Sequence, residues 1–172
     1  MEKKDMRLYN AVFPIWLLWL FPVTWLVALP ANFLIDLLVV VLTMVRLKIP
    51  DKKKTVKCTI WKVWIAGFIA DFAGALAMSA MVLLPVRSIP VLGTWLAENV
   101  AYPIGSNPFT NIFAFFWVTG CVLLTAFLIY RLNLGWCLKK ADLDDGQKKK
   151  IALSLAVFTA PYLFYLPTVW FV

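Results

Sequence analysis

Long apolar stretches separated by short polar ones dominate the chain. Three of them, about 61–85, 110–131 and 151–171, each hold roughly the 20 apolar residues that a helix needs to cross the ~30 Å hydrocarbon core of a bilayer. A fourth, 9–47, would measure roughly 58 Å as a single helix at ~1.5 Å per residue, about twice that thickness. The pattern therefore predicts a helical membrane protein with a break inside residues 9–47.

The predicted break lies at residues 29–32, Leu-Pro-Ala-Asn. Proline lacks an amide hydrogen and disfavours the α conformation in the residue before it, and Asn32 is a suitable helix N-cap. We predict a tight hairpin of two spans, about 9–29 and 32–47, with its turn at the outer surface. In the alternative, the first segment is a Trp-rich interfacial or re-entrant helix, leaving four spans. A cleavable signal peptide fits less well, because this apolar run is long and contains three prolines.

The basic residues are concentrated between the spans. Sixteen of the 17 Lys and Arg residues lie in the stretches 3–7, 46–62 and 131–150, and only Arg87 lies in the connection 86–109. The positive-inside rule predicts a cytoplasmic N-terminus and cytoplasmic basic loops, with 86–109 and the C-terminus outside. The lipid bilayer is the expected partner, because basic loops attract anionic headgroups. The net charge of +8 therefore does not indicate nucleic-acid binding.

Composition supports the membrane assignment. The chain is 63% hydrophobic with a mean hydropathy of +0.83, and a soluble core of 172 residues cannot bury that much apolar surface. We predict one transmembrane domain over residues 1–172, an all-α polytopic bundle with five transmembrane helices in the cell membrane. The chain is small for a solitary carrier, so a homo-oligomer or a larger membrane complex is expected. Cys58, Cys121 and Cys137 are predicted to be reduced thiols, because their spacing forms no disulfide frame.

Two connecting features modify this simple pattern. The connection 86–109 is long and mostly apolar, which predicts a short amphipathic helix in the outer loop that Pro103 should end. The last span contains Pro161 and Pro167 and is expected to bend or unwind locally. The apolar face of the amphipathic helix is expected to carry Leu92, Trp95, Leu96 and Val100.

Ionisable residues inside the predicted spans are the main functional lead, because a charge at membrane depth is costly. Asp71 lies about nine residues after Lys62, near the midplane, whereas Asp36 lies about four residues after the predicted turn, near the outer surface. The difference in depth predicts that the two carboxyl groups do not form an acid pair. They are interpreted as two stations on one path.

Asp71 belongs to a helix with small residues at three- and four-residue spacing, which allows close helix contacts and predicts a central position. No Lys or Arg lies at its depth, so Asp71 must be protonated, bound to a cation or hydrogen-bonded to neutral groups. A buried acid that only fixes helix packing is the competing interpretation. Candidate cavity-lining residues are Asn32, Ser79, Thr119, Tyr162 and Tyr165.

Catalytic motifs are scarce in the sequence. The absence of histidine removes His-based triads, most membrane metalloprotease sites and His-ligated haem, and no phosphate-binding loop or nucleophile elbow occurs. We therefore predict no enzymatic activity, no metal site and no cofactor. The predicted function is that of a transporter or channel component for a small solute or ion, with Asp71 and Asp36 as the binding or coupling residues. The alternative is a non-catalytic accessory, regulatory or immunity-type membrane subunit that docks on a larger partner.

Overall fold

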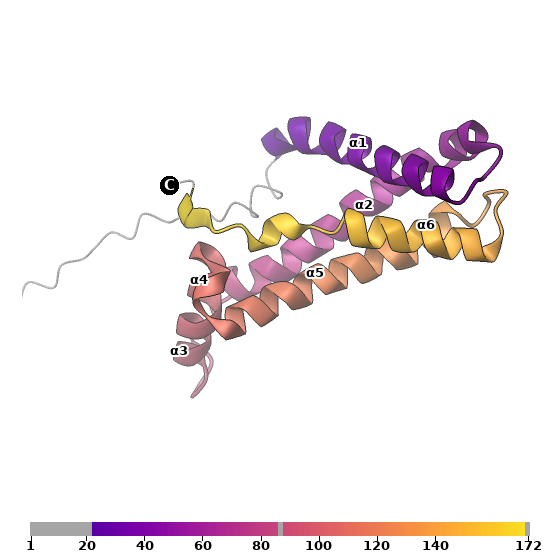
Figure 1. Ribbon diagram of the computed structural model, residues 1–172. Coiled ribbons are helices and arrows are strands. Elements are labelled where there is room, and N and C mark those ends of the chain that lie inside the picture. The colour runs from indigo at the N-terminus through magenta and orange to yellow at the C-terminus, as the bar shows by residue number, and fades with distance from the viewer. Residues whose placement is uncertain (1–21, 86–87, 171–172) are drawn as a thin grey trace, which may run out of the picture.

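The computed structural model describes residues 22–85 and 88–170, and every regular element in them is helical (Figure 1). The four long helices are α1 (Pro22–Arg46), α2 (Lys52–Leu83), α5 (Ile112–Leu132) and α6 (Asp145–Phe158). Within the described residues three segments, Leu29–Arg46, Lys52–Leu83 and Ile112–Cys137, are long and apolar enough to cross a membrane. The all-helical architecture is confirmed, and three helices of the described residues suit a membrane protein, whereas the five predicted spans are not established.

Helix α2 is the centre of the bundle. It packs against both α1 and α5 over much of its length, and Ala66 and Ala70 are fully buried in these contacts. The small-residue pattern therefore predicted its central position correctly. The helix begins at Lys52 instead of residue 61, so the basic residues before the apolar stretch are helical too. Within this part the hydroxyl of Thr59 donates to the carbonyl of Thr55 at 2.8 Å.

Helix α1 runs through Pro30, so the predicted hairpin turn at residues 29–32 is wrong. The indole Nε1 of Trp64 donates to the Leu29 carbonyl at 2.8 Å and ties this part of α1 to α2. The carbonyl that Pro30 leaves without its helical donor is that of Leu26, four residues earlier. Asn32 does not cap a helix, since its side chain donates to Asp71. Residues 22–29 of the predicted first span form the start of α1, while residues 9–21 and the predicted cytoplasmic N-terminus lie outside the described residues.

The C-terminal element is broken, as the prolines predicted. Helix α6 starts at a capping box between Asp144 and Gln147 and ends at Phe158. Two short 3₁₀ turns, Tyr162–Tyr165 and Thr168–Trp170, follow it, so residues 151–171 are not one continuous helix. Because Pro161 has no amide hydrogen, it cannot make the helical bond to the carbonyl of Val157.

The connection between α2 and α5 is a helical segment of three parts: α3 (Gly93–Leu96), a π-helical turn (Ala97–Ala101) and α4 (Tyr102–Ser106). Pro103 does not end it, contrary to the prediction. The amide of Tyr102 bonds back to the Ala97 carbonyl in the wider π register, and Pro103 then sits in the first turn of α4, where a missing donor costs little.

The face of this segment that packs on the bundle differs from the predicted one. Of the four residues expected on the apolar face, Val100 is buried, whereas Leu92 and Trp95 are exposed. Small residues allow the close packing instead. The buried residues of this segment are Gly93, Ala97, Val100, Ala101, Pro103 and Ile104.

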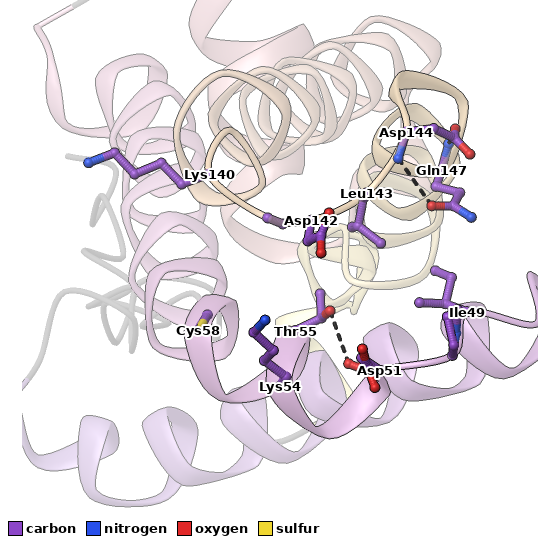
Figure 2. Close-up of a pocket in the computed structure, with 12 residues that line it drawn as sticks. Ile49, Asp51, Lys54, Thr55, Cys58, Lys140, Asp142, Leu143, Asp144 and Gln147 are labelled. Atoms are coloured by element: carbon purple, nitrogen blue, oxygen red, sulfur yellow. Dashed lines mark hydrogen bonds between the residues drawn. The ribbon is translucent and has the colours of Figure 1, made fainter.

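The two loops 47–51 and 138–144, which belong to the basic stretches 46–62 and 131–150, lie at the same end of the bundle, opposite α3 and α4 (Figure 1). Figure 2 shows them facing each other across a cavity of about 440 Å³, which includes Asp51 and Lys54 on one side and Lys140 and Asp142 on the other. Placement of both loops at one end agrees with the charge pattern.

Two apolar cores fill the bundle, one toward each end. The core at the basic end includes Ala70 of α2 and Ala156 of α6, and the other includes Ala75 of α2 and Phe164 of the first 3₁₀ turn. Asp71 and the break after α6 therefore fall, along the chain, between the residues of the two cores. This is the place where a polar cavity interrupts the packing.

Candidate functional site

A cavity of about 270 Å³ opens between α1, α2 and the broken end of α6. Helix α1 contributes Asn32 and Asp36, and α2 contributes Gly67 and Asp71. The third wall is the segment 158–163, where α6 ends and the chain turns into its first 3₁₀ turn. Irregular backbone at membrane depth is tolerated where it is buried in protein or lines a polar cavity.

Asp71 is one of the two buried acids of this cavity. Its side chain is only 5% exposed, and its Oδ2 accepts a hydrogen bond of 3.3 Å from the Asn32 amide. Its other oxygen, Oδ1, is buried and has no hydrogen-bond partner among the described residues. An unsatisfied buried acceptor costs about 1–3 kcal/mol, and more if the group is charged, so this oxygen requires an explanation.

Asp36 reaches the same cavity from α1. It is 4% exposed, and a Cβ placed on Gly67 would lie 3.3 Å from its Oδ2, so the absent side chain of Gly67 lets the carboxyl group approach the α2 backbone. Gly67 is one helical turn before Asp71, and the two carboxyl groups interact electrostatically. Gly67 is thus the residue that allows the two acids to share a site.

The prediction that Asp36 and Asp71 lie at different depths and form no pair is therefore wrong. It depended on the hairpin turn at residues 29–32, which α1 does not make. In the continuous helix Asp36 lies ten residues before Arg46, or about 15 Å along the axis, and Asp71 lies nine residues after Lys62, or about 14 Å. The antiparallel helices bring the two residues to the same level.

The charges of the cavity do not balance within the protein. No Lys or Arg lines it, and neither acid forms an ion pair in the part of the chain that the structure describes. The C-terminal end of α6 adds a partial negative charge, as helix ends do. Two buried carboxyl groups in this setting cannot both be ionised unless a cation compensates their charge. Without a cation, at least one of them is protonated.

Only part of the predicted cavity lining is found there. Asn32 and Tyr162 line the cavity with the two acids. Ser79 is buried elsewhere on α2, where its hydroxyl donates to the Ala75 carbonyl at 2.7 Å. Thr119 and Tyr165 meet each other instead, since the Tyr165 hydroxyl donates to the Thr119 hydroxyl at 2.9 Å.

Sequence reasoning missed three contributors to the site, Gly67, Thr159 and Pro161. Gly67 belongs to the small-residue pattern of this helix, but the pattern does not show that the Asp36 carboxyl group approaches it. Thr159 and Pro161 lie in the break that closes the cavity, and the two prolines of this region were the available signal. The described residues contain no group of three or more His, Cys, Asp or Glu side chains that could hold a metal ion.

The cysteines are free thiols in this structure, Cys58 exposed and the other two buried. Cys58 lies within α2, and Cys137 ends a π-helical turn, Asn133–Cys137, that extends α5. None of them lines the cavity that contains Asp36 and Asp71.

Comparison with protein-family models finds no match, and comparisons with curated proteins and with solved structures find none either. The function is therefore inferred from the cavity itself.

Proposed function

We propose that the protein is a small multi-pass membrane transporter or channel component for a small ion or solute, and that the Asp36–Asp71 cavity is its polar station. The observation that carries this proposal is the buried, unpartnered Oδ1 of Asp71, a residue that lines one cavity together with Asp36. A buried acid that served only packing would have its acceptor atoms satisfied by neighbouring donors. An acceptor oxygen without a protein partner is instead suited to a ligand that binds and dissociates.

The broken C-terminal element supports the same proposal. Interrupted helices in transporters place freed backbone carbonyls and helix ends around a site near the midplane, where they coordinate cations or protons. Here α6 ends at the cavity, and the Tyr162 hydroxyl donates to the Val157 carbonyl, which Pro161 leaves without its helical donor. The remaining end of the helix faces a site that already contains two acids.

The proposed threading follows from the charges. Helices α1, α2 and α5 and the segment from α6 to Trp170 each cross the membrane. The loops 47–51 and 138–144, with the basic residues of the stretches 46–62 and 131–150, lie in the cytoplasm, and the α3–α4 segment lies outside. Whether residues 1–21 add a fifth crossing stays a prediction. So small a bundle is proposed to work as an oligomer or within a larger membrane complex, without catalysing a reaction.

Flux measurements on reconstituted protein test the proposal. Asp71→Asn keeps the size of the side chain and its hydrogen bond to Asn32 but removes the ionisable group. We expect this variant to insert and fold, yet to lose flux or its pH dependence in proteoliposomes. The matched control is Asp142→Asn, the same change at an exposed loop residue, which should leave flux unchanged.

Two results would contradict transport. One is a folded wild-type protein without measurable flux of any ion or small solute for which a gradient is applied, protons, alkali and alkaline-earth cations included. The other is an Asp71→Asn variant that transports at the wild-type rate with unchanged pH dependence. Either result favours the alternative of a non-catalytic subunit that docks on a larger membrane partner.

A further inference from the structure

We infer that the Asp36–Asp71 cavity binds a partly hydrated divalent cation of the Mg²⁺ class. Movement of that cation across the membrane rests on the proposed function, whereas its binding does not. The inference rests on the charges, the ligand atoms and the size of the cavity.

The charge of the cavity points to an ion with two positive charges. Asp36 and Asp71 are 4% and 5% exposed, and no basic side chain lines the space between them. A monovalent cation neutralises one carboxylate and leaves the other to find a proton. One divalent cation balances both at once, which matters most where water is largely excluded.

The cavity is lined partly by apolar side chains, among them Ile35, Phe158 and Leu163, and its polar atoms are mostly oxygen acceptors. Asp71 Oδ1 has no partner, and Asp36 accepts no side-chain hydrogen bond from any described residue. The only side-chain donor recorded at the pair is the Asn32 amide, already used by Asp71 Oδ2. Hard cations such as Mg²⁺ and Ca²⁺ take oxygen ligands, and a helix end supplies carbonyl groups without helical partners.

The volume of the cavity distinguishes a hydrated ion from a bare one. About 270 Å³ is available, whereas a water molecule in the liquid occupies ~30 Å³. The space therefore holds an ion together with several waters. Mg²⁺ gives up its waters reluctantly and is usually bound by one or two carboxylates with water in its remaining positions, which matches a site with two acids.

No sequence motif announces this site, because its two carboxylates lie on different helices and 35 positions apart. Gly67, which has no side chain, leaves room for the Asp36 carboxyl group beside α2. A Cβ at that position would stand 3.3 Å from Asp36 Oδ2, so Gly67→Ala should push the two acids apart or displace one of them. The sharing of one ion therefore depends on a residue that carries no ligand atom.

Binding is tested on the purified full chain in detergent, with Mn²⁺ as a paramagnetic probe. We expect saturable binding near one ion per chain by electron paramagnetic resonance, displaced by Mg²⁺ and unaffected by Na⁺ at matched ionic strength. Asp71→Asn and Asp36→Asn should each weaken binding at least about tenfold, the scale of loss known for removal of even an outer-shell partner of a metal ligand. Asp142→Asn is the matched control and should bind like the wild type.

Absence of saturable Mn²⁺ binding by the folded wild-type protein overturns the inference, as does binding that Na⁺ displaces or that Asp71→Asn leaves intact. If Asp71→Asn fails to fold, Asp71→Glu and Gly67→Ala replace it, and wild-type affinity in both overturns the inference equally. Saturable binding with the predicted losses supports it even when no flux is measured, since that combination contradicts transport alone.

Discussion

Pro30 and Pro161 both lie in strongly apolar segments, yet α1 continues through the first while α6 ends shortly before the second. At Pro30 the carbonyl without its helical donor is that of Leu26, and the Trp64 indole of the neighbouring helix bonds to the Leu29 carbonyl beside the proline and holds α1 against α2. At Pro161 the donors come from the segment itself: the Thr159 hydroxyl bonds to the Leu155 carbonyl, and the Tyr162 hydroxyl bonds to the Val157 carbonyl.

The difference teaches that the contacts around a proline decide whether a membrane helix continues through it. A hydrogen bond from an adjacent helix holds α1 in place beside Pro30, whereas side chains that cap the carbonyls locally let α6 end. Pro167 follows Pro161 by six residues, which leaves little room for a new α-helical turn. The broken segment then lines the cavity, and the continuous helix delivers Asp36 to it.

Replacing each proline should separate the two cases most clearly. Pro161→Ala restores an amide donor for the Val157 carbonyl, so α6 should extend into the space of the cavity and flux and Mn²⁺ binding should fall sharply. Pro30→Ala should leave both intact and stabilise α1 by up to ~3 kcal/mol, the helix-interior difference between Pro and Ala. Unfolding and binding measurements on both variants check this, and equal behaviour of the two would remove the distinction.

Gly74 tests how firmly the segment after the break is docked. A Cβ there would collide with the Thr125 hydroxyl and lie 3.0 Å from a ring carbon of Phe164. We expect Gly74→Ala to destabilise the protein by about 1–3 kcal/mol through overpacking. Gly120→Ala is the control, because its new Cβ meets nothing within 4 Å and alanine favours the helix. Thermal unfolding in detergent compares them, and a neutral Gly74→Ala argues against close packing of α2, α5 and the 3₁₀ turn.

Removal of a single side-chain donor on either side should have the smallest effect. Trp64→Phe removes the bond to Leu29, and Tyr162→Phe removes the bond to Val157. Each is expected to cost about 0.5–1.5 kcal/mol, with the loss at Trp64 accompanied by faster amide exchange near Pro30. Hydrogen exchange with mass spectrometry locates the change. Faster exchange at residues 158–163 in Trp64→Phe, with none near Pro30, would contradict the roles assigned to these donors.

The sequence predicted the general architecture and the central helix because these depend on composition and on local spacing. Helices α2 and α5 are long and apolar enough to span a membrane, and the small residues Ala66 and Ala70 indicate that α2 lies at the centre. The turn at residues 29–32 was predicted wrongly because Pro30 was read without the packing of α1 on α2. Trp64, whose indole binds α1 beside the proline, lies 35 positions after Leu29.

The candidate site was predicted in its residues but not in its geometry. Asp36, Asp71, Asn32 and Tyr162 were singled out because polar groups at membrane depth are unusual, and the structure brings these four to one cavity. Their meeting depends on the register of α1 against α2, which follows from the absence of the hairpin. The depth of Asp36 was counted from the predicted turn at residues 29–32. Because that turn does not exist, the prediction separated two acids that line the same cavity.

The central claim, that Asp36 of α1 and Asp71 of α2 share one cavity, is tested most directly by bridging the two positions. In a background with Cys58, Cys121 and Cys137 replaced by Ser, Asp36→Cys with Asp71→Cys should be joined by a short bifunctional thiol reagent in membranes. Leu26→Cys with Asp71→Cys, in which the α1 position lies almost three turns earlier, should remain unbridged. Bridging of the first pair alone is the predicted result. Failure of that pair to react, while each single cysteine still reacts, would contradict the account.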